Sequence, residues 1–346
     1  MRVLIAPDKF AGTLTAPQAA AAIAAGWRRH DPGALLDLAP LSDGGPGFVE
    51  VLHAALGGRL VQVTAHGPLG EPTPGTVLLA PDGTAYVEVA QACGLHLLPP
   101  DRRRPMEASS AGVADLLRAA LDVGAGRVVV GVGGTASTDG GQPCVEAFGG
   151  AGSWPAGIPL AVATDVDAPL LGPNGAAAVF GPQKGADRDQ VLDLQVRLAE
   201  WAKQSGGDAS AEGAGAGGGL GYGLMLLGGT RVPGVQTVVE ALRLPQRMEQ
   251  VDLALTGEGT FDETSLQGKV PRGVAWAAQR AARPCVVLAG RVLVGRREFA
   301  AAGIDAAYAV EETAGSVAAA LAEPAARLAD LAERVARTWT PRSSVR

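Results

Sequence analysis

One stretch, residues 251–273 (VDLALTGEGTFDETSLQGKVPRG), most constrains how this chain can fold. Its alternating apolar residues predict a strand, which runs into a Gly-Glu-Gly turn at residues 257–259, where a ligand can approach the backbone closely. Pro271 suits the first turn of the alanine-rich helix that follows, and a second strand is predicted at residues 285–288. A strand, a polar loop, a helix and another strand form a crossover that belongs in a parallel sheet. The sequence therefore predicts an α/β fold.

The N-terminal part of the chain repeats this order. Residues 2–6 predict a strand, and after a polar loop Thr15 is a good N-cap for an alanine-rich helix. Residues 35–41 predict the next strand, which ends in the acidic, glycine-rich loop SDGG, and residues 48–56 predict a helix. The patterns at both ends of the chain thus predict parallel strands that are followed by polar, acidic loops.

The middle of the chain has a different residue pattern. Residues 60–88 contain short alternating strands separated by Gly, Pro and Asp turns, which is typical of an antiparallel piece. Further on, the pattern predicts helices at residues 110–123 and 187–203 and strands at residues 127–130 and 159–164. After the strand at 285–288, it predicts a strand at 302–310 and a closing helix or helix pair at 314–338.

The length of 346 residues suits two domains. Because the two ends resemble each other, we predict a discontinuous Rossmann-like parallel-sheet domain from residues 1–60 and 235–346. Residues 61–234 are then an inserted second α/β domain with glycine-rich loops. Apolar residues make up 47% of the chain and aromatic residues 4%, which suits helices packed on a parallel sheet. A cleft between the domains is expected to receive the polar loops.

Charge and cysteine content exclude several classes of protein. The net charge of −6 gives no basic footprint for nucleic acid or an anionic membrane, so a small-molecule partner is predicted. No apolar run approaches 18 residues, and Pro7 and Asp8 interrupt the N-terminal run where a signal peptide needs continued hydrophobicity. Three widely spaced cysteines indicate neither a disulfide framework nor a zinc site. We therefore expect a cytoplasmic protein without a membrane anchor.

Five aspartates share one place in the predicted fold, at or shortly after the end of a strand: Asp8, Asp43, Asp165, Asp167 and Asp262. Several carboxylates that meet in one cleft repel one another unless they hold a cation or share a proton. Mg²⁺ that bridges the phosphates of a nucleotide needs only one or two of them. The plain alternative is that each aspartate caps a helix or turn. Three lysines are candidates to steady phosphate charge, with a surface position as the ordinary alternative: Lys9, Lys184 and Lys269.

The loop GVGGTASTDGG after the strand at 127–130 fits the Gly-x-Gly-x-x-Gly/Ala pattern of nicotinamide-binding folds. The helix that should meet a pyrophosphate is delayed there, because Gly140, Gly141 and Pro143 follow. Glycines with nearby hydroxyls form a more general cradle of N–H and O–H donors for a phosphate or carboxylate. A glycine-rich run at residues 205–223 predicts a flexible or ligand-wrapping segment.

Six blocks together resemble the type-1 glycerate kinase family, in the order of that family: IAPDKFAGTLTA, PLSDGGPGFVEVL, GVGGTASTDGG, ATDVDAPLLGPNGAAAVFGPQKGA, GAGGGLGYG and TGEGTFDETSLQGKVPRGVA. The resemblance implies a two-domain α/β kinase that uses ATP and Mg²⁺ to phosphorylate a hydroxyl of D-glycerate. It also implies an active site in the interdomain cleft.

Particular residues are the candidates for each role in this chemistry. The catalytic candidates are Asp8, Lys9 and Asp262, with Asp8 as the first choice among several aspartates for the group that orients or deprotonates the hydroxyl. The candidates for binding substrate or phosphate are Asp43, Gly44, Gly45, Gly133, Gly134, Thr135, Ser137, Asp139, Gly140, Gly257, Glu258 and Lys269. Asp165 and Asp167 are the candidate metal ligands, with Asp43 and Asp262 also considered.

The chain departs from the family pattern at Ala11, where lysine is usual, at Thr138, where asparagine is usual, and at Thr260, where arginine is usual. Between residues 148 and 158 it is shorter than the family by roughly thirty residues, on the evidence of the family's usual spacing. Two other functions stay open: an NAD-dependent hydroxy-acid dehydrogenase, and a weakened kinase relative that binds a small acid. The hydroxyl that is phosphorylated and the oligomeric state, for which a homodimer is one candidate, are not fixed by the sequence.

Overall fold

The computed structural model describes residues 1–10, 12–315 and 317–340. Its internal contacts divide the chain into two compact units, a first unit of Met1–Ser42 with Val238–Arg346 and a second unit of Asp43–Thr237. The predicted α/β class is confirmed by two sheets that contain parallel strands and are covered by helices. The domain limits predicted at residues 60 and 235 stay a prediction, and the helix at 48–56 packs with the second unit.

The first unit is built on a five-stranded sheet in the order β13-β11-β9-β1-β2, in which every neighbouring pair is parallel. Its strands are β1 (Arg2–Ile5), β2 (Leu35–Leu38), β9 (Leu253–Thr256), β11 (Cys285–Ala289) and β13 (Ala306–Ala309). A separate two-stranded parallel sheet joins β10 (Thr260–Phe261) to β12 (Arg291–Val292). The predicted strand at 35–41 is shorter than expected, because pairing with β1 stops at Leu38.

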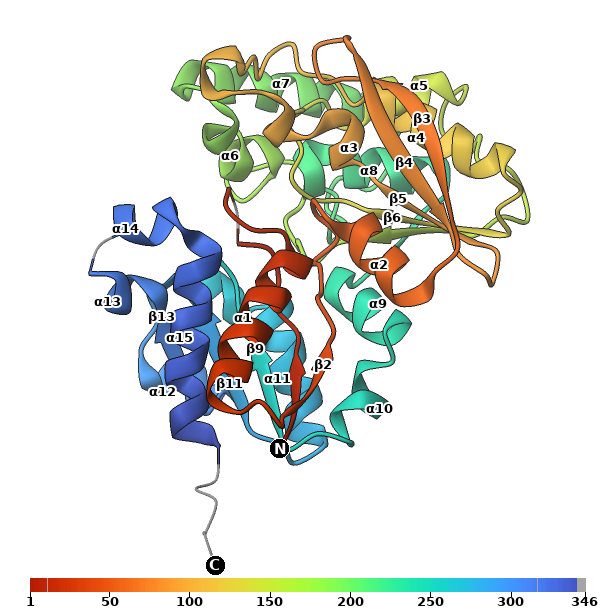
Figure 1. Ribbon diagram of the computed structural model, residues 1–346. Coiled ribbons are helices and arrows are strands. Elements are labelled where there is room, and N and C mark those ends of the chain that lie inside the picture. The colour runs from red at the N-terminus through yellow and green to blue at the C-terminus, as the bar shows by residue number, and fades with distance from the viewer. Residues whose placement is uncertain (11, 316, 341–346) are drawn as a thin grey trace, which may run out of the picture. The chain divides into compact units, whose positions relative to one another are not determined.

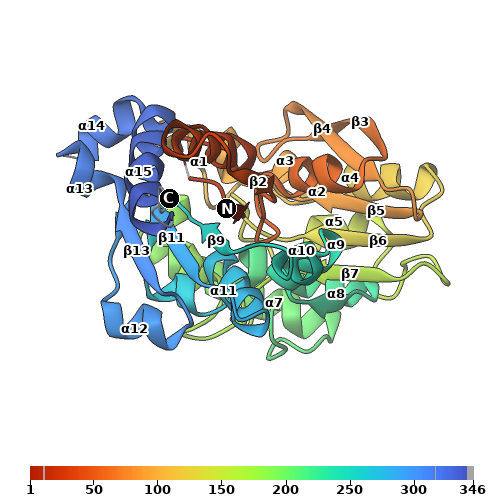
Figure 2. The same ribbon diagram turned by 60° about the horizontal axis from the view of Figure 1, so that its bottom comes forward.

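Helices cover both faces of this sheet (Figure 1, Figure 2). The helices α1 (Ala16–His30) and α15 (Pro324–Trp339) lie on one face, and α11 (Val270–Arg280) and α12 (Arg296–Ala301) lie on the other. The remaining helices of the first unit are α10 (Leu244–Met248), α13 (Val310–Ala314), α14 (Val317–Ala322) and the 3-10 turn η5 (Glu263–Leu266). The buried core under α1 and α15 comes from alternate residues of the central strands, as the two-residue period of a strand requires.

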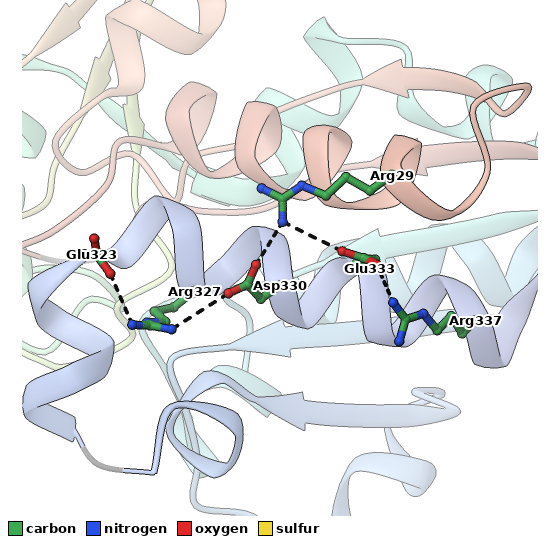
Figure 3. Close-up of polar contacts among 6 residues, drawn as sticks. All are labelled: Arg29, Glu323, Arg327, Asp330, Glu333 and Arg337. Atoms are coloured by element: carbon green, nitrogen blue, oxygen red, sulfur yellow. Dashed lines mark hydrogen bonds and ion pairs between the residues drawn. The ribbon is translucent and has the colours of Figure 1, made fainter.

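The packing of α1 against α15 explains several features of the sequence. Thr15 caps α1 as predicted, since its hydroxyl accepts the N–H of Gln18 while its own N–H donates to the side chain of Gln18. Gly26 lets the helices approach, because a Cβ there would lie 1.9 Å from the carbonyl oxygen of Ala329. Figure 3 shows the exposed side of the pair, where Arg29 bridges two acidic residues of α15, Asp330 and Glu333. Such exposed ion pairs contribute at most about 1 kcal/mol each.

The second unit contains a six-stranded mixed sheet in the order β3-β4-β5-β6-β7-β8. Its strands are β3 (Arg59–His66), β4 (Pro72–Leu79), β5 (Thr84–Glu88), β6 (Arg127–Gly131), β7 (Leu160–Ala163) and β8 (Thr230–Val232). The first three strands pair in antiparallel fashion, which confirms the antiparallel piece predicted at 60–88. From β5 to β8 every pair is parallel, so the polar loops after β6 and β7 leave the same edge of the sheet.

Helices also cover this second sheet. The core cluster joins one face of the sheet to α4 (Ala111–Asp122), α5 (Gln142–Ala147) and α8 (Leu220–Leu227), while α2 (Phe48–Leu56) packs on β4 and β5. The other helices are α3 (Ala90–Cys93), α6 (Ala176–Phe180) and α7 (Arg188–Ser205), together with the short 3-10 turns η1 (Leu95–Leu97), η2 (Pro100–Arg102), η3 (Pro182–Lys184) and η4 (Ala216–Gly219). Helix α9 (Gly234–Ala241) contains the point at which the chain passes from one unit to the other.

The glycine-rich run at 205–223, predicted to be a flexible or ligand-wrapping segment, contains defined secondary structure. Much of the run is buried, and it contains η4 and the start of α8. Glycine is needed there for close packing and left-handed backbone, as at Gly218, whose φ is +72°. Among the described residues, no helix is both long and apolar enough to cross a membrane.

Candidate functional site

Polar residues were predicted at strand ends, and each unit gathers a cluster of them. In the first unit, parallel pairing of β1 with β9 brings together loops that are about 250 residues apart, as shown by the hydrogen bond of the Asp8 N–H to the carbonyl of Gly257, 2.8 Å. Both loops leave the carboxyl ends of their strands, where open α/β sheets bind ligands. Asp8 and Glu258 are buried there, with 4% and 6% of their surfaces exposed.

Asp8 is paired with its neighbour in the chain. The Oδ1 atom of Asp8 accepts the backbone N–H of Lys9 at 2.7 Å and lies 3.5 Å from the ammonium of Lys9. The lysine side chain is about three-quarters buried, so its charge is poorly screened by water. The two catalytic candidates from this loop therefore form a partly enclosed ion pair.

Glu258 follows β9 on the Gly-Glu-Gly turn, and its Oε1 atom is buried without a hydrogen-bond partner among the described residues. Burial raises the pKa of Glu258 to about 7. The hydroxyl of Ser265 and the ammonium of Lys269 oppose that rise, while the negative charges of Asp8 and Asp262 add to it. This raised pKa distinguishes Glu258 from an ordinary surface glutamate.

Asp262 caps the turn η5. Its Oδ1 atom accepts hydrogen bonds from the N–H and hydroxyl of Thr264, at 2.9 and 2.6 Å, and from the N–H of Ser265 at 3.3 Å. Partial burial alone would raise the pKa of Asp262, but the Thr264 hydroxyl, Lys269 and the two N–H groups lower it below its usual value. The capping alternative foreseen for the aspartates therefore applies here, and Asp262 remains ionised beside Glu258.

Lys269 completes the first cluster at the N-terminus of α11. It occupies the N-cap position, and Pro271 lies in the first turn as predicted. Its charge acts on both Glu258 and Asp262. The candidates Asp8, Lys9, Gly257, Glu258, Asp262 and Lys269 are therefore gathered in the first unit.

In the second unit the loop at 132–141 follows β6 and packs on the glycines of another loop. A Cβ added at Gly133 would lie 2.8 Å from the Cα of Gly45, and one at Gly44 would lie 2.8 Å from the carbonyl oxygen of Ala163. Gly44, Gly134 and Gly140 also have φ angles of +90°, +68° and +68°, which side chains disfavour. The helix after the loop begins only at Gln142, so the delayed start read from the sequence is confirmed.

Asp139 and Lys184 hold this loop from within the second unit. The carboxylate of Asp139 accepts the N–H of Ser110 at 2.7 Å and that of Gly141 at 3.1 Å, and burial raises the pKa of Asp139. Lys184 donates to the hydroxyl of Thr135 at 3.1 Å and, by a short contact, to the carbonyl of Ser137. Burial lowers the pKa of Lys184 to about 8.

Lys184 is a residue whose place the sequence did not reveal. A surface position was the ordinary expectation for it, but only 3% of its surface is exposed. Its setting, PQKG in a short turn after the apolar run AAAVF, carried at most a weak signal of burial. Ser137 and Thr138 are also buried in the loop, and their hydroxyl oxygens have no partner among the described residues.

Asp165 and Asp167, the predicted metal ligands, are engaged with protein groups. The two oxygens of Asp165 accept the N–H groups of Gly234 and Val235, each at 2.9 Å, and burial raises its pKa to about 6. Asp167 is largely exposed and forms a short ion pair with Arg231. Across the described part of the chain, no group of three or more His, Cys, Asp or Glu side chains is arranged to hold a metal.

Asp43 lies close to Asp165 within the second unit, because a Cβ added at Gly234 would lie 2.5 Å from the Asp43 carbonyl oxygen and 3.0 Å from Asp165 Oδ2. The Oδ1 atom of Asp43 accepts the N–H of Gly45 at 3.1 Å. The second unit therefore gathers Asp43, Gly44, Gly45, Gly133, Gly134, Thr135, Ser137, Asp139, Gly140 and Asp165 at one edge of its sheet. The predicted cleft shared by both units stays a prediction.

The departures from the family pattern fall in different places. Thr260 begins β10 and is half-buried, and Thr138 lies in the loop after β6. Ala11 lies outside the described residues. The stretch at 148–158, expected to be shorter than in the family, forms the connection from α5 to β7.

This chain is similar to known proteins in sequence and in structure over most of its length. The model of the glycerate kinase family matches residues 3–153 and 150–340. A glycerate kinase of Bacillus subtilis is 39% identical over 344 residues, covering 90% of each chain, and an uncharacterized protein of Mycobacterium tuberculosis is 47% identical, covering 97% of this chain and 91% of its own. The crystal structure of a putative glycerate kinase 2 from Salmonella typhimurium superposes with a TM-score of 0.76 at 34% identity and covers 98% of both chains.

Proposed function

The chain belongs to the glycerate kinase family, and we propose that it transfers the γ-phosphoryl group of ATP to a hydroxyl of D-glycerate to give 2- or 3-phosphoglycerate. The observation that carries the proposal is that the family match extends over the loops of both units, including every candidate site residue. The acidic cluster of the first unit supports it, because carboxylates with shifted pKa values are typical of catalytic sites.

In the proposed reaction the glycerate hydroxyl oxygen forms a bond to the γ-phosphorus, the bond from that phosphorus to the bridging oxygen breaks, and ADP leaves. Such transfer depends mainly on positioning and on stabilising charge. Asp8, Lys9 and Asp262 are proposed to orient the hydroxyl, a carboxylate of this cluster to accept its proton, and Lys269 to steady phosphate charge. In the second unit, the glycine-rich loops at residues 133–140 and 44–45 are proposed to bind phosphate or the substrate carboxylate.

ATP is proposed to enter with Mg²⁺, which would supply positive charge to its phosphates. Asp165 fits poorly as a ligand in the described arrangement, because each of its oxygens already accepts an N–H. Asp167 is paired with Arg231. We therefore assign no step of the reaction to these two residues, although Mg²⁺ on a nucleotide needs only one or two protein carboxylates.

The direct test is to incubate the purified protein with ATP, Mg²⁺ and D-glycerate and to identify the product by phosphorus NMR. We expect one phosphoglycerate, whose chemical shift and coupling identify the hydroxyl that is phosphorylated, and none with glycerate omitted. Binding of ATP or glycerate in a thermal shift assay without any product would instead favour the small-acid binding alternative. Quenching of NADH fluorescence without ATP turnover would favour the dehydrogenase.

A further inference from the structure

Glu258 contains an unusual buried atom. Its carboxyl oxygen Oε1 is fully buried and has no hydrogen-bond partner among the described residues. No other acidic side chain in the described part of the chain has such an oxygen. An unpaired buried polar atom lowers the stability of the fold, so its presence calls for an explanation. A ligand group that donates a hydrogen bond to Oε1 would remove that cost.

The backbone around Glu258 is held rigidly. The carbonyl of Gly257 accepts the N–H of Asp8 at 2.8 Å, and the carbonyls of Glu258 and Gly259 accept the N–H groups of Gly290 and Arg291 at 3.1 and 3.0 Å. The turn is also closely packed, because a Cβ added at Gly257 would lie 2.0 Å from the carbonyl oxygen of Leu288. The backbone at Glu258 is therefore fixed by its neighbours, which suits a residue that must present its side chain in a defined place.

The charged groups around Glu258 come from several elements. Asp8 from the loop after β1, Asp262 from the start of η5 and Lys269 from the start of α11 all act on its carboxyl group. The guanidinium of Arg291, on the neighbouring strand, pairs instead with Glu311 at 3.0 Å. Two lysines, Lys9 beside Asp8 and Lys269, thus accompany three carboxyl groups. Burial, with the negative charges of Asp8 and Asp262, favours a proton on Glu258.

The other two acids of the cluster are poorer proton acceptors. Asp8 accepts an N–H from Lys9 and lies beside its ammonium, and Asp262 accepts hydrogen bonds from Thr264 and Ser265. Each of these contacts stabilises the ionised carboxylate and so weakens it as a base. Glu258 combines a vacant acceptor oxygen with an environment that favours its protonated form.

We propose that Glu258, rather than Asp8, is the general base that accepts the proton of the acceptor hydroxyl through Oε1. This inference rests on the proposed kinase function. As the hydroxyl oxygen bonds to the γ-phosphorus, its proton passes to the Glu258 carboxylate, and ADP leaves with the electron pair of the broken bond. Asp8 then acts as a positioning residue that holds Lys9 and, through its N–H, the Gly257 carbonyl.

The test compares Glu258→Gln, which keeps the size of the side chain but accepts no proton, with Glu258→Asp and with the exposed control Glu249→Gln. We expect kcat of Glu258→Gln to fall by about 10²–10⁴-fold, with the KM for ATP and the Mg²⁺ requirement little changed. The wild-type kcat should rise with pH through a pKa near 7, and Glu258→Gln should lose this acid limb. Glu258→Asp should keep the limb at reduced kcat, and thermal unfolding of each variant verifies its fold.

Each result decides the proposal. Activity of Glu258→Gln within about tenfold of wild type, or an unchanged acid limb, would overturn the base while leaving the kinase function standing. Recovery of Glu258→Gln by high Mg²⁺ would identify a metal ligand instead. If Glu258→Gln does not fold, absence of the acid limb from the wild type or from Glu258→Asp overturns the base. A wild-type protein that forms no phosphoglycerate would reject the kinase proposal and the base together.

Discussion

The two polar clusters occupy equivalent places in their units, at the carboxyl ends of parallel strands, but they are built from opposite chemistry. The cluster of the first unit presents carboxylates, of which Asp8 and Glu258 are buried. The loop after β6 in the second unit presents glycines and hydroxyls, and its buried lysine donates inward to the loop itself. The first arrangement suits proton transfer and charge control, whereas the second suits a shaped surface of N–H donors.

This difference shows that burial has different consequences in the two units. In the first unit, burial leaves an oxygen of Glu258 without a partner, which is a state that a ligand can relieve. In the second unit, burial of Lys184 is compensated by Thr135 and Ser137, which fixes the loop before any ligand arrives. Substitutions in the first cluster are therefore expected to change mainly the activity, and substitutions in the second cluster mainly the stability.

The largest effect is expected on activity from the first cluster. Asp262→Asn and Asp8→Asn should each reduce kcat by about 10³-fold or more while leaving the fold intact, because asparagine preserves an acceptor oxygen but removes the charge. Steady-state kinetics and urea unfolding measure the two quantities separately. The control is Asp252→Asn. Asp252 lies just before β9, at the opposite end of the strand, and its carboxylate accepts the N–H of Arg2. Full activity of both cluster variants would reject these assignments.

A smaller effect, on stability, is expected from the packing of the second unit. In Gly218→Ala the new Cβ would lie 2.0 Å from the Ser137 carbonyl oxygen and 2.6 Å from the Lys184 ammonium, so the loop must shift. We expect the free energy of unfolding to fall by at least about 3 kcal/mol in urea. Gly149→Ala shares the positive φ but has open space around it, and should lose only about 1 kcal/mol. Equal losses in the two variants would show that the close contact is unimportant.

The smallest effect is expected from Lys184→Met, which removes the charge but keeps an unbranched chain. Loss of its hydrogen bonds leaves Thr135 and Ser137 unsatisfied and should lower the free energy of unfolding by about 1–3 kcal/mol at neutral pH. Lys203→Met, at an exposed position on α7, is the matched control and should change stability by less than about 0.5 kcal/mol.

The same variant gives a pH dependence of known sign. The pKa of Lys184 is lowered from 10.5 to about 8 in the folded protein, so between these values the unfolded chain binds a proton that the folded chain has lost. Wild-type stability therefore gains a contribution as pH rises from 8 towards 10.5, and that contribution is absent below pH 8. The contribution of Lys184 is isolated by measuring the free energy of unfolding against pH for both proteins and subtracting the values for Lys184→Met from those for the wild type. A flat difference over the range would show that Lys184 is not buried as a charged group.

Much of the fold could be predicted because local patterns agree with the tertiary structure. The cap at Thr15, the antiparallel strands and the parallel crossovers all follow from short-range rules. Strand length was predicted less well, since β2 ends at Leu38 where its partner β1 ends. At 205–223 composition left a flexible and a ligand-wrapping segment open, and the structure adds that many of these glycines are closely packed against other loops.

The sequence by itself determined the family, the α/β class and the set of polar residues at strand ends, because motifs and periodicity are local properties. It did not distinguish Asp8 from Glu258 as a base or separate a surface lysine from a buried one. Those properties depend on which side chains surround a group and how much water reaches it. Only the tertiary structure decided that Asp8 is charge-paired, that an oxygen of Glu258 is left without a partner, and that Lys184 is enclosed.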